Sequence, residues 1–217
     1  LGIVMAEYEF ALFDTPIGRC GIVWSERGVA SLQLPEGKEL ATRARLARRF
    51  PGAAVGKPPP AVQDALQQID ALLHGKASDL ARIALDMSSV PPFYQRVYAA
   101  ARAIAPGQTL SYGELARQLG TPGSARAVGQ ALGKNPFAII VPCHRVLAAN
   151  GRVGGFSANG GITTKLRLLG ITTCFGNCAV EDATRNAQRV LALAGREDVP
   201  VAAGAAGPAL RRLDHGP

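Results

Sequence analysis

Two adjacent prolines, Pro91 and Pro92, divide the chain into two halves with different hydrophobic patterns, and no other feature limits the fold as strongly. Proline lacks a backbone N–H and has a fixed φ, so neither a helix nor a strand continues through the pair. Alternating apolar residues before the prolines predict strands, whereas helical spacing dominates after them. The sequence therefore predicts a small α/β unit followed by a mainly helical one.

The first half contains signals for both strands and helices. Three strand-like runs are separated by turn-rich breaks and predict a β-meander: residues 8–13, 20–24 and 29–34. Apolar residues at helical spacing predict helices within residues 38–50 and 61–74, and residues 83–86 are a further short strand candidate. These elements are typical of a compact α/β unit.

The second half is predicted to contain a helix over residues 93–104 and then two short helices around a tight turn. Ser111 and Glu114 have the spacing of a capping box, which starts a helix over residues 112–119. Ser124 is the expected cap of the next helix, residues 125–132. Such a pair fits either a DNA-reading helix-turn-helix or an ordinary helical hairpin.

The charge is concentrated in one part of the chain. The 217 residues carry a formal net charge of +8, and residues 91–170 hold nine Lys and Arg against one acidic residue. The segments on either side are neutral. A concentrated excess favours a polyanionic partner, nucleic acid first, although solvated surface charge is the alternative.

Several classes of protein are disfavoured by the sequence. No run approaches the ~18 apolar residues of a membrane span, and the residues before Met5, a candidate start, do not resemble a signal peptide. The four cysteines have neither a disulfide-framework nor a zinc spacing, so no metal is expected. No Gly-rich run has phosphate-loop spacing. We expect a cytoplasmic protein with reduced thiols.

Cys143 is the candidate nucleophile. It precedes His144 and Arg145, and a cationic neighbourhood lowers a thiol pKa. Histidine is the usual group that accepts the proton of a thiol nucleophile. Composition alone leaves the alternative that Cys143 is a small core residue.

Pro142-Cys-His-Arg-Val146 is the active-site signature of the O6-alkylguanine-DNA alkyltransferases, also called methylated-DNA–protein-cysteine methyltransferases. The chain resembles this family over about residues 7–169. Further segments recur in the family's order and spacing: Thr15-Pro-Ile-Gly18, Trp24-Ser-Glu-Arg-Gly28, Ser111-Tyr-Gly-Glu-Leu-Ala116, Ala125-Arg-Ala-Val-Gly129, Gly133-Lys-Asn-Pro136, Gly151-Arg-Val-Gly154 and Lys165.

The resemblance implies a ribonuclease H-like N-terminal domain over residues 1–88 and an alkyltransferase domain with a helix-turn-helix over residues 89–170. It implies DNA repair without a cofactor, by stoichiometric transfer of an alkyl group from O6-alkylguanine to Cys143. O4-alkylthymine is a further candidate substrate. The implied partner is double-stranded DNA carrying alkylated bases. The protein is expected to be a monomer that does not associate with a membrane.

The resemblance also implies roles for individual residues. His144 takes the thiol proton of Cys143, Tyr112 donates its phenolic proton to the guanine ring, and Asn135 orders the turn. Arg126 enters the base stack in place of the flipped nucleotide. The other implied DNA-binding and base-pocket positions are Ser124, Ala125, Gly129 and Lys134 for DNA, and Val146, Phe156 and Ser157 for the pocket.

Two departures from the family pattern affect the chemistry. The family Glu that accepts the other imidazole proton is replaced by Thr172, and Phe156 stands where the family often has Tyr. The alternative function is therefore a protein that binds alkylated DNA with impaired transfer.

The last segment resembles a different family. From Leu169-Gly-Ile-Thr-Thr-Cys-Phe-Gly-Asn177 onward, roughly residues 168–213 are similar to a β-α-β stretch of inosine/uridine-preferring nucleoside hydrolases. The calcium-binding Asp cluster of those enzymes does not precede it. We expect residues 171–217 to be an appended fragment without hydrolase activity.

Overall fold

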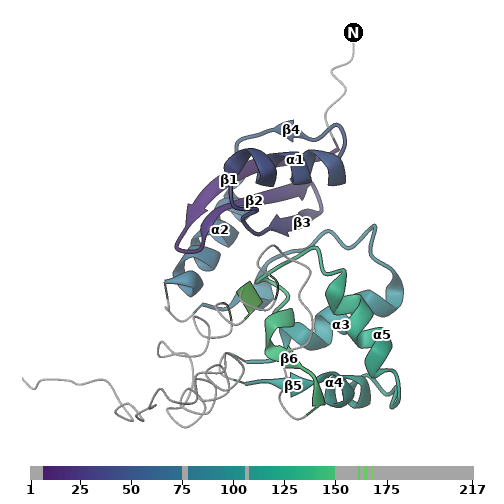
Figure 1. Ribbon diagram of the computed structural model, residues 1–217. Coiled ribbons are helices and arrows are strands. Elements are labelled where there is room, and N and C mark those ends of the chain that lie inside the picture. The colour runs from purple at the N-terminus through teal and green to yellow at the C-terminus, as the bar shows by residue number, and fades with distance from the viewer. Residues whose placement is uncertain are drawn as a thin grey trace, which may run out of the picture.

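The computed structural model describes residues 7–74, 78–105 and 108–149, together with Gly161, Thr164, Lys165 and Leu168. The architecture is mixed α/β (Figure 1). A sheet with two helices lies in one half, and three helices with a two-stranded sheet lie in the other. The predicted change of class across Pro91–Pro92 is confirmed, and Pro92 is the first residue of a helix.

The larger sheet contains the three predicted strands and a fourth that the pattern did not predict. Strands β1 (Glu9–Thr15), β2 (Gly18–Ser25) and β3 (Gly28–Gln33) form an antiparallel meander. Strand β4 (Ala54–Val55) pairs parallel with β1, giving the order β3-β2-β1-β4. Gly28 has a φ of +128°, and a Cβ there would lie 2.6 Å from the Ala84 carbonyl oxygen, so this turn requires glycine.

Each face of this sheet is covered by one helix. Helix α1 (Glu39–Arg49) buries Leu46 in a small cluster with Phe10, Val23 and Ala30. Helix α2 (Pro60–Leu73) covers the opposite face and packs into the main core. Each of its turns contributes buried residues to that core: Val62, Ala65, Ile69, Leu72 and Leu73. Both helices were predicted from the 3.6-residue period. The predicted stop of α2 at Gly75 lies outside the described residues.

Residues 83–86, the predicted short strand, run extended beside β3 without forming a regular strand. A 3-10 turn, η1 (Leu80–Arg82), precedes them. The Val29 amide donates to the Ala84 carbonyl at 2.9 Å, and the Asp86 amide donates to the Val29 carbonyl at 2.8 Å. The pairing is an isolated bridge between Val29 and Leu85, so the strand prediction was wrong in extent.

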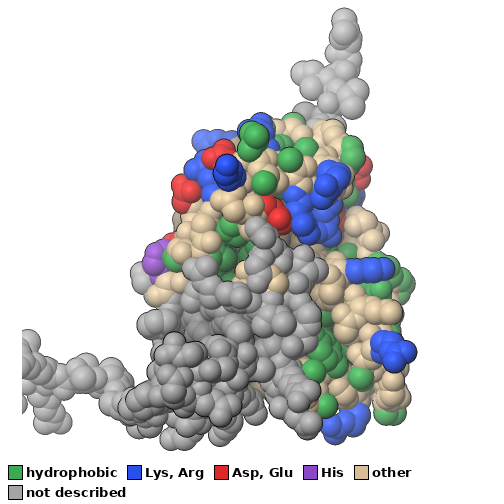
Figure 2. Space-filling model, viewed as in Figure 1, with side chains coloured by type: hydrophobic (Ala, Val, Ile, Leu, Met, Phe, Trp, Pro, Cys, Tyr) green, Lys and Arg blue, Asp and Glu red, His purple; other side chains and the backbone are tan. Residues whose placement is uncertain are grey.

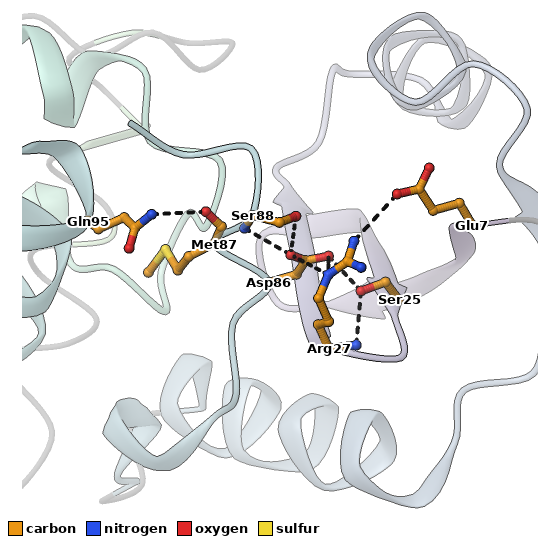
Figure 3. A network of polar contacts seen from close by, with 7 residues as sticks. All are labelled: Glu7, Ser25, Arg27, Asp86, Met87, Ser88 and Gln95. Carbon is orange, nitrogen blue, oxygen red and sulfur yellow. Dashed lines mark hydrogen bonds and ion pairs between the residues drawn. The ribbon is translucent and has the colours of Figure 1, made fainter. Parts of the chain in front are cut away.

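Asp86 is the centre of a polar network at the end of the first half, next to the junction with the helical half (Figure 3). Its carboxylate accepts hydrogen bonds from the Ser25 hydroxyl at 2.6 Å, from Arg27 Nε at 3.1 Å and from the Ser88 amide at 3.0 Å. Burial alone raises the pKa of Asp86, but these hydrogen bonds outweigh it and hold the pKa well below its usual range. On the helical side, Gln95 donates to the Met87 carbonyl at 3.2 Å.

The helical half consists of α3 (Pro92–Arg102), α4 (Tyr112–Gln118) and α5 (Ala125–Gly133). Strand β5 (Leu110–Ser111) pairs parallel with β6 (Val146–Leu147), which brings the start of α4 beside the segment that follows Cys143. This two-stranded pairing was not predicted. No helix in the described ranges is long and apolar enough to cross a membrane.

The capping predictions for α4 and α5 had different outcomes. The capping box of α4 is confirmed, because the Glu114 amide donates to the Ser111 hydroxyl and the Ser111 amide donates to the Glu114 carboxylate. Ser124 is the N-cap residue of α5, as predicted, but its side chain makes no capping hydrogen bond. Its hydroxyl donates instead to the Thr121 carbonyl at 2.8 Å, within the preceding turn.

The two halves share a continuous core. The Leu32 amide and the Ser31 hydroxyl both donate to the Pro136 carbonyl, at 2.9 and 3.1 Å. Leu32 also forms an isolated bridge with Phe137, which is fully buried. β3 is an edge strand, and its outer edge hydrogen-bonds to the segment that leads from α5 to Cys143.

Candidate active site

A tight turn places Cys143. Ala138 and Val141 form an isolated bridge, and Ile139 between them has a φ of +70°, a conformation that is strained for a β-branched residue. The Asn135 side chain stabilises this turn, because its Nδ2 donates to the Val141 carbonyl at 3.0 Å and its Oδ1 accepts from the Phe137 amide at 2.9 Å. The predicted ordering role of Asn135 agrees with these contacts.

Cys143 begins a single 3-10 turn, η2 (Cys143–Arg145), and is only 7% exposed. We call Pro142–Val146 the reactive turn. Burial raises the pKa of the Cys143 thiol, and a hydrogen bond with Asn135, the charge of Lys165 and the backbone N–H groups of Cys143 and His144 oppose that rise. The expected net lowering by His144 and Arg145 is therefore wrong, because burial dominates and the opposing cation is Lys165.

His144 is fully buried and its pKa lies well below the usual value. Burial is the main cause, and the charges of Arg145 and Lys165 add to it. The imidazole is therefore neutral at neutral pH, which is the form that accepts a proton. The site thus combines a protonated thiol with a neutral base.

Tyr112, the first residue of α4, lies on the other side of a buried lysine. The Lys165 ammonium donates to the Val146 carbonyl at 2.9 Å and to the Tyr112 hydroxyl at 3.4 Å, and Lys165 is only 1% exposed. Burial raises the pKa of the Tyr112 phenol, and the charge of Cys143 raises it further. Cys143, Tyr112 and Lys165 therefore form one electrostatically coupled cluster.

Lys165 is the residue that the sequence reasoning missed. It was noted only as part of a recurring motif and was given no function. The available signal was a lysine at a fixed place in the recurring motif, Lys165-Leu-Arg-Leu-Leu169. The Val146 carbonyl, predicted to line the base pocket, accepts the Lys165 hydrogen bond.

The predicted DNA-binding residues lie in helix α5 or at its two ends. Arg126 lies in its first turn and is exposed, and Lys134 is exposed at its end. Gly129 lies beneath Tyr112, where an added Cβ would meet the ring at 3.8 Å. Ser124 and Ala125 are partly buried at the N-terminus of α5. Figure 2 shows further Lys and Arg side chains on the face over α1.

Other predicted positions lie outside the described residues: Phe156, Ser157 and Thr172. Cys20 and Cys143 are free thiols. Within the described ranges, no three His, Cys, Asp or Glu side chains group so as to hold a metal ion.

Comparison with known proteins identifies the family. The chain is 35% identical over 163 residues to the methylated-DNA–protein-cysteine methyltransferase of Mycolicibacterium paratuberculosis, covering 75% of this chain and 91% of that protein. The chain belongs to the methylated-DNA–protein-cysteine methyltransferase family. The family model for the DNA-binding domain of 6-O-methylguanine DNA methyltransferase matches residues 92–172.

Other methyltransferase relatives match shorter stretches. The protein of the same name from Mycobacterium leprae is 49% identical over 109 residues, which is 50% of this chain and 64% of that protein. A crystal structure of the Mycobacterium tuberculosis O6-methylguanine methyltransferase is 34% identical with a TM-score of 0.63, covering 80% of this chain and 98% of that one. A structure titled Mycobacterium tuberculosis OGT in complex with DNA is 33% identical with a TM-score of 0.62, covering 83% and 98%.

The tail matches a second family model, the inosine-uridine preferring nucleoside hydrolase, over residues 158–217. The predicted second resemblance is thus confirmed, and the match begins before the predicted boundary at residue 168. The chain therefore joins a methyltransferase to a segment similar to a nucleoside hydrolase.

Proposed function

We propose that this chain repairs DNA by transferring an alkyl group from O6-alkylguanine to the sulfur of Cys143. The observation that carries the proposal is the cluster at the reactive turn: Cys143 and a neutral His144 are buried there beside the charge of Lys165, which contacts the partly buried Tyr112. Family membership and a relative whose structure is titled a complex with DNA support the substrate class.

In the proposed step, the alkyl group moves from guanine O6 to the sulfur of Cys143, and two protons are transferred. His144 accepts the proton of the Cys143 thiol, and the thiolate attacks the O6-alkyl carbon. The S–C bond forms as the C–O6 bond breaks, and the electron pair moves into the guanine. Tyr112 donates its phenolic proton to the guanine ring, so the base leaves neutral. The thioether is stable, so each protein molecule reacts once.

Lys165 supports both anions that this step creates. Its ammonium lowers the pKa of the Cys143 thiol and lies 3.4 Å from the Tyr112 hydroxyl oxygen. A fixed cation at the site of developing charge is worth more in a buried site than in water. We therefore assign Lys165 a role in stabilising the thiolate and the phenolate.

For DNA docking, we propose that α4 and α5 form a helix-turn-helix. The exposed Arg126 is placed to fill the stack after the base is extruded. Ser124, Ala125, Gly129 and Lys134 would line the DNA along α5. We further propose a ribonuclease H-like domain over residues 1–88, an alkyltransferase domain over 89–170 and an appended segment over 171–217, which the family match at residues 92–172 supports.

The experiment is single-turnover reaction with duplex DNA carrying O6-methylguanine, followed by peptide mass spectrometry. One methyl group is expected on the Cys143 peptide and none on the Cys20 peptide. Cys20 is an internal control because it is buried and its thiol pKa is raised to about 11. Methylation of both cysteines, or of neither, would refute the assignment, and Cys143→Ser should remain unmodified. A duplex with O4-methylthymine tests the second substrate.

The alternative is a protein that binds alkylated DNA with impaired transfer, and it rests on Thr172 in place of the family Glu. The discriminating variant is Thr172→Glu. A large rate increase would support impairment, since removing one member of a triad costs orders of magnitude without abolishing the reaction. An unchanged, fast rate would reject it.

A further inference from the structure

A cavity is lined in part by Pro142 and Arg145 of the reactive turn and has no role in the proposed transfer. Its volume is about 680 Å³. Its lining is largely apolar, and the residues that matter most to its chemistry are Leu80, Arg102, Ile104, Ile139, Pro142 and Arg145. Small-molecule sites are cavities of this size with apolar walls and a few polar groups that fix orientation.

Arg145 provides a buried positive charge in this cavity. It is 6% exposed, and its Nη1 donates to the Ile104 carbonyl at 2.8 Å. Its Nε is buried and has no hydrogen-bond partner, and no described ion pair includes Arg145. Burial lowers the pKa of Arg145 to about 10. A buried guanidinium without a carboxylate is costly, so it favours an anionic partner.

Arg102 provides a second guanidinium from the end of α3. Its Nη2 donates to three backbone carbonyls, those of Leu80, Ala81 and Ile83, at 2.8, 2.6 and 2.8 Å. Its Nε is also buried without a partner. Burial lowers the pKa of Arg102 as well. The backbone contacts hold the guanidinium in place, and the charge of Asp79 opposes the lowering of its pKa.

Asp79 is the one acidic residue of the lining, and its charge acts on Arg102 as well as on Arg82. Its carboxylate accepts from the Ala81 amide at 2.9 Å and lies 3.6 Å from Arg82 Nε. Its side chain is 65% exposed, so water screens its charge. The guanidinium groups of the buried Arg145 and the partly exposed Arg102 therefore set the charge of the cavity.

We propose that this cavity binds a small organic anion, a phosphate or carboxylate attached to an apolar body. The anionic group would lie against Arg102 and Arg145, and the apolar body would contact Leu80, Ile104 and Ile139. Because Arg145 directly follows His144, a bound anion would neutralise a charge next to the proposed base. The proposal concerns binding alone and does not depend on alkyl transfer.

The test uses amide NMR spectra of the full chain titrated with three probes: phenyl phosphate, inorganic phosphate and benzyl alcohol. Phenyl phosphate should shift the amides of Ala81, Ala103 and Ala105, which surround the cavity. It should bind about tenfold more tightly than inorganic phosphate, because the ring buries apolar area. Benzyl alcohol, which lacks the charge, should bind much more weakly.

The variant Ser78→Glu places a carboxylate in the cavity lining and should weaken phenyl phosphate binding about tenfold by repulsion. Ala105→Glu does the same from another element and replaces the first variant if that one does not fold. Gln67→Glu, exposed on α2, adds the same charge elsewhere and should leave binding unchanged.

Three outcomes would overturn the proposal. One is that benzyl alcohol binds as tightly as phenyl phosphate, which would mean that the cavity selects for apolar groups and not for an anion. Another is amide shifts confined to α5, which would mean binding at the proposed DNA surface. The third is an equal loss in Ser78→Glu and Gln67→Glu, which would mean a general charge effect. The proposed repair function is tested separately, by the mass of the Cys143 peptide.

Discussion

Replacing Asp86 by Asn should destabilise the fold through the polar network that joins residues 86–88 to Ser25 and Arg27. The Asp86 side chain is 1% exposed, whereas Arg27 is 53% exposed (Figure 3). Asn keeps one acceptor oxygen, so the Ser88 contacts at Oδ1 are retained. The new amide faces Arg27 Nε, and two donors then oppose each other across 3.2 Å.

The magnitude follows from the contacts that are lost. A hydrogen bond to a charged group contributes about 1.5–3 kcal/mol, and the half-exposed Arg27 regains hydration when its partner is lost. The Ser25 hydroxyl, 2.6 Å from Oδ2, can turn and accept from the new amide. We therefore expect a loss of about 2–3 kcal/mol in the free energy of unfolding, or about 4–12 °C in Tm.

The effect should depend on pH in a defined direction. Since the folded pKa of Asp86 is depressed, its stabilisation is complete above the unfolded value of about 3.9 and is lost as the pH falls through the folded pKa. The difference in stability between the wild type and Asp86→Asn should therefore be constant from pH 5 to 7 and shrink below about pH 4.

Urea denaturation at pH 7 and pH 3 measures both effects. Asp14→Asn is the matched control, because Asp14 pairs with Arg19 at 3.1 Å while its side chain is 79% exposed, so little stability should be lost. Equal losses in the two variants, or a difference that grows in acid, would refute the reasoning.

Three predictions concern the reaction. Tyr112→Phe should slow methyl transfer about 10²–10⁴-fold while DNA affinity is retained, as measured by quenched single-turnover assays and fluorescence anisotropy. Lys165→Met should raise the pKa of the Cys143 thiol, so the rate should recover as the pH increases, and a uniform loss at every pH would contradict the electrostatic role. Because burial keeps His144 neutral, the wild-type rate should not fall between pH 7.5 and 6 as it would with an ordinary imidazole, and a midpoint near 6.5 would exclude His144 as the buried base.

Sequence predicted the parts of the fold that local interactions decide. The capping box of Ser111 and Glu114 depends on residues three apart, and it forms as predicted. Ser124 lacks a Glu three residues later, since Ala127 stands there, and its hydroxyl bonds to Thr121 instead of capping α5. Strands β4 and β6 are two residues long and depend on distant partners, so no period exists to predict them.

The candidate site was predicted in its residues but not in its electrostatics. The reactive turn was named from a motif, and its cationic neighbours in sequence suggested a lowered thiol pKa. Arg145 instead donates to the Ile104 carbonyl and lines the cavity with Arg102. The charge that acts on Cys143 comes from Lys165, which is 22 positions away in the chain. Burial and long-range contacts decided this difference.

The two described cysteines show what distinguishes a reactive thiol from a core thiol in this fold. Both are buried, and burial raises both pKa values. At Cys20 only the Thr15 hydroxyl opposes burial, at 3.6 Å. At Cys143 an amide side chain, a lysine charge and two backbone N–H groups all favour the thiolate. Since a thiolate is the nucleophile, we expect reactivity to follow these opposing groups, which are more numerous at Cys143 than at Cys20.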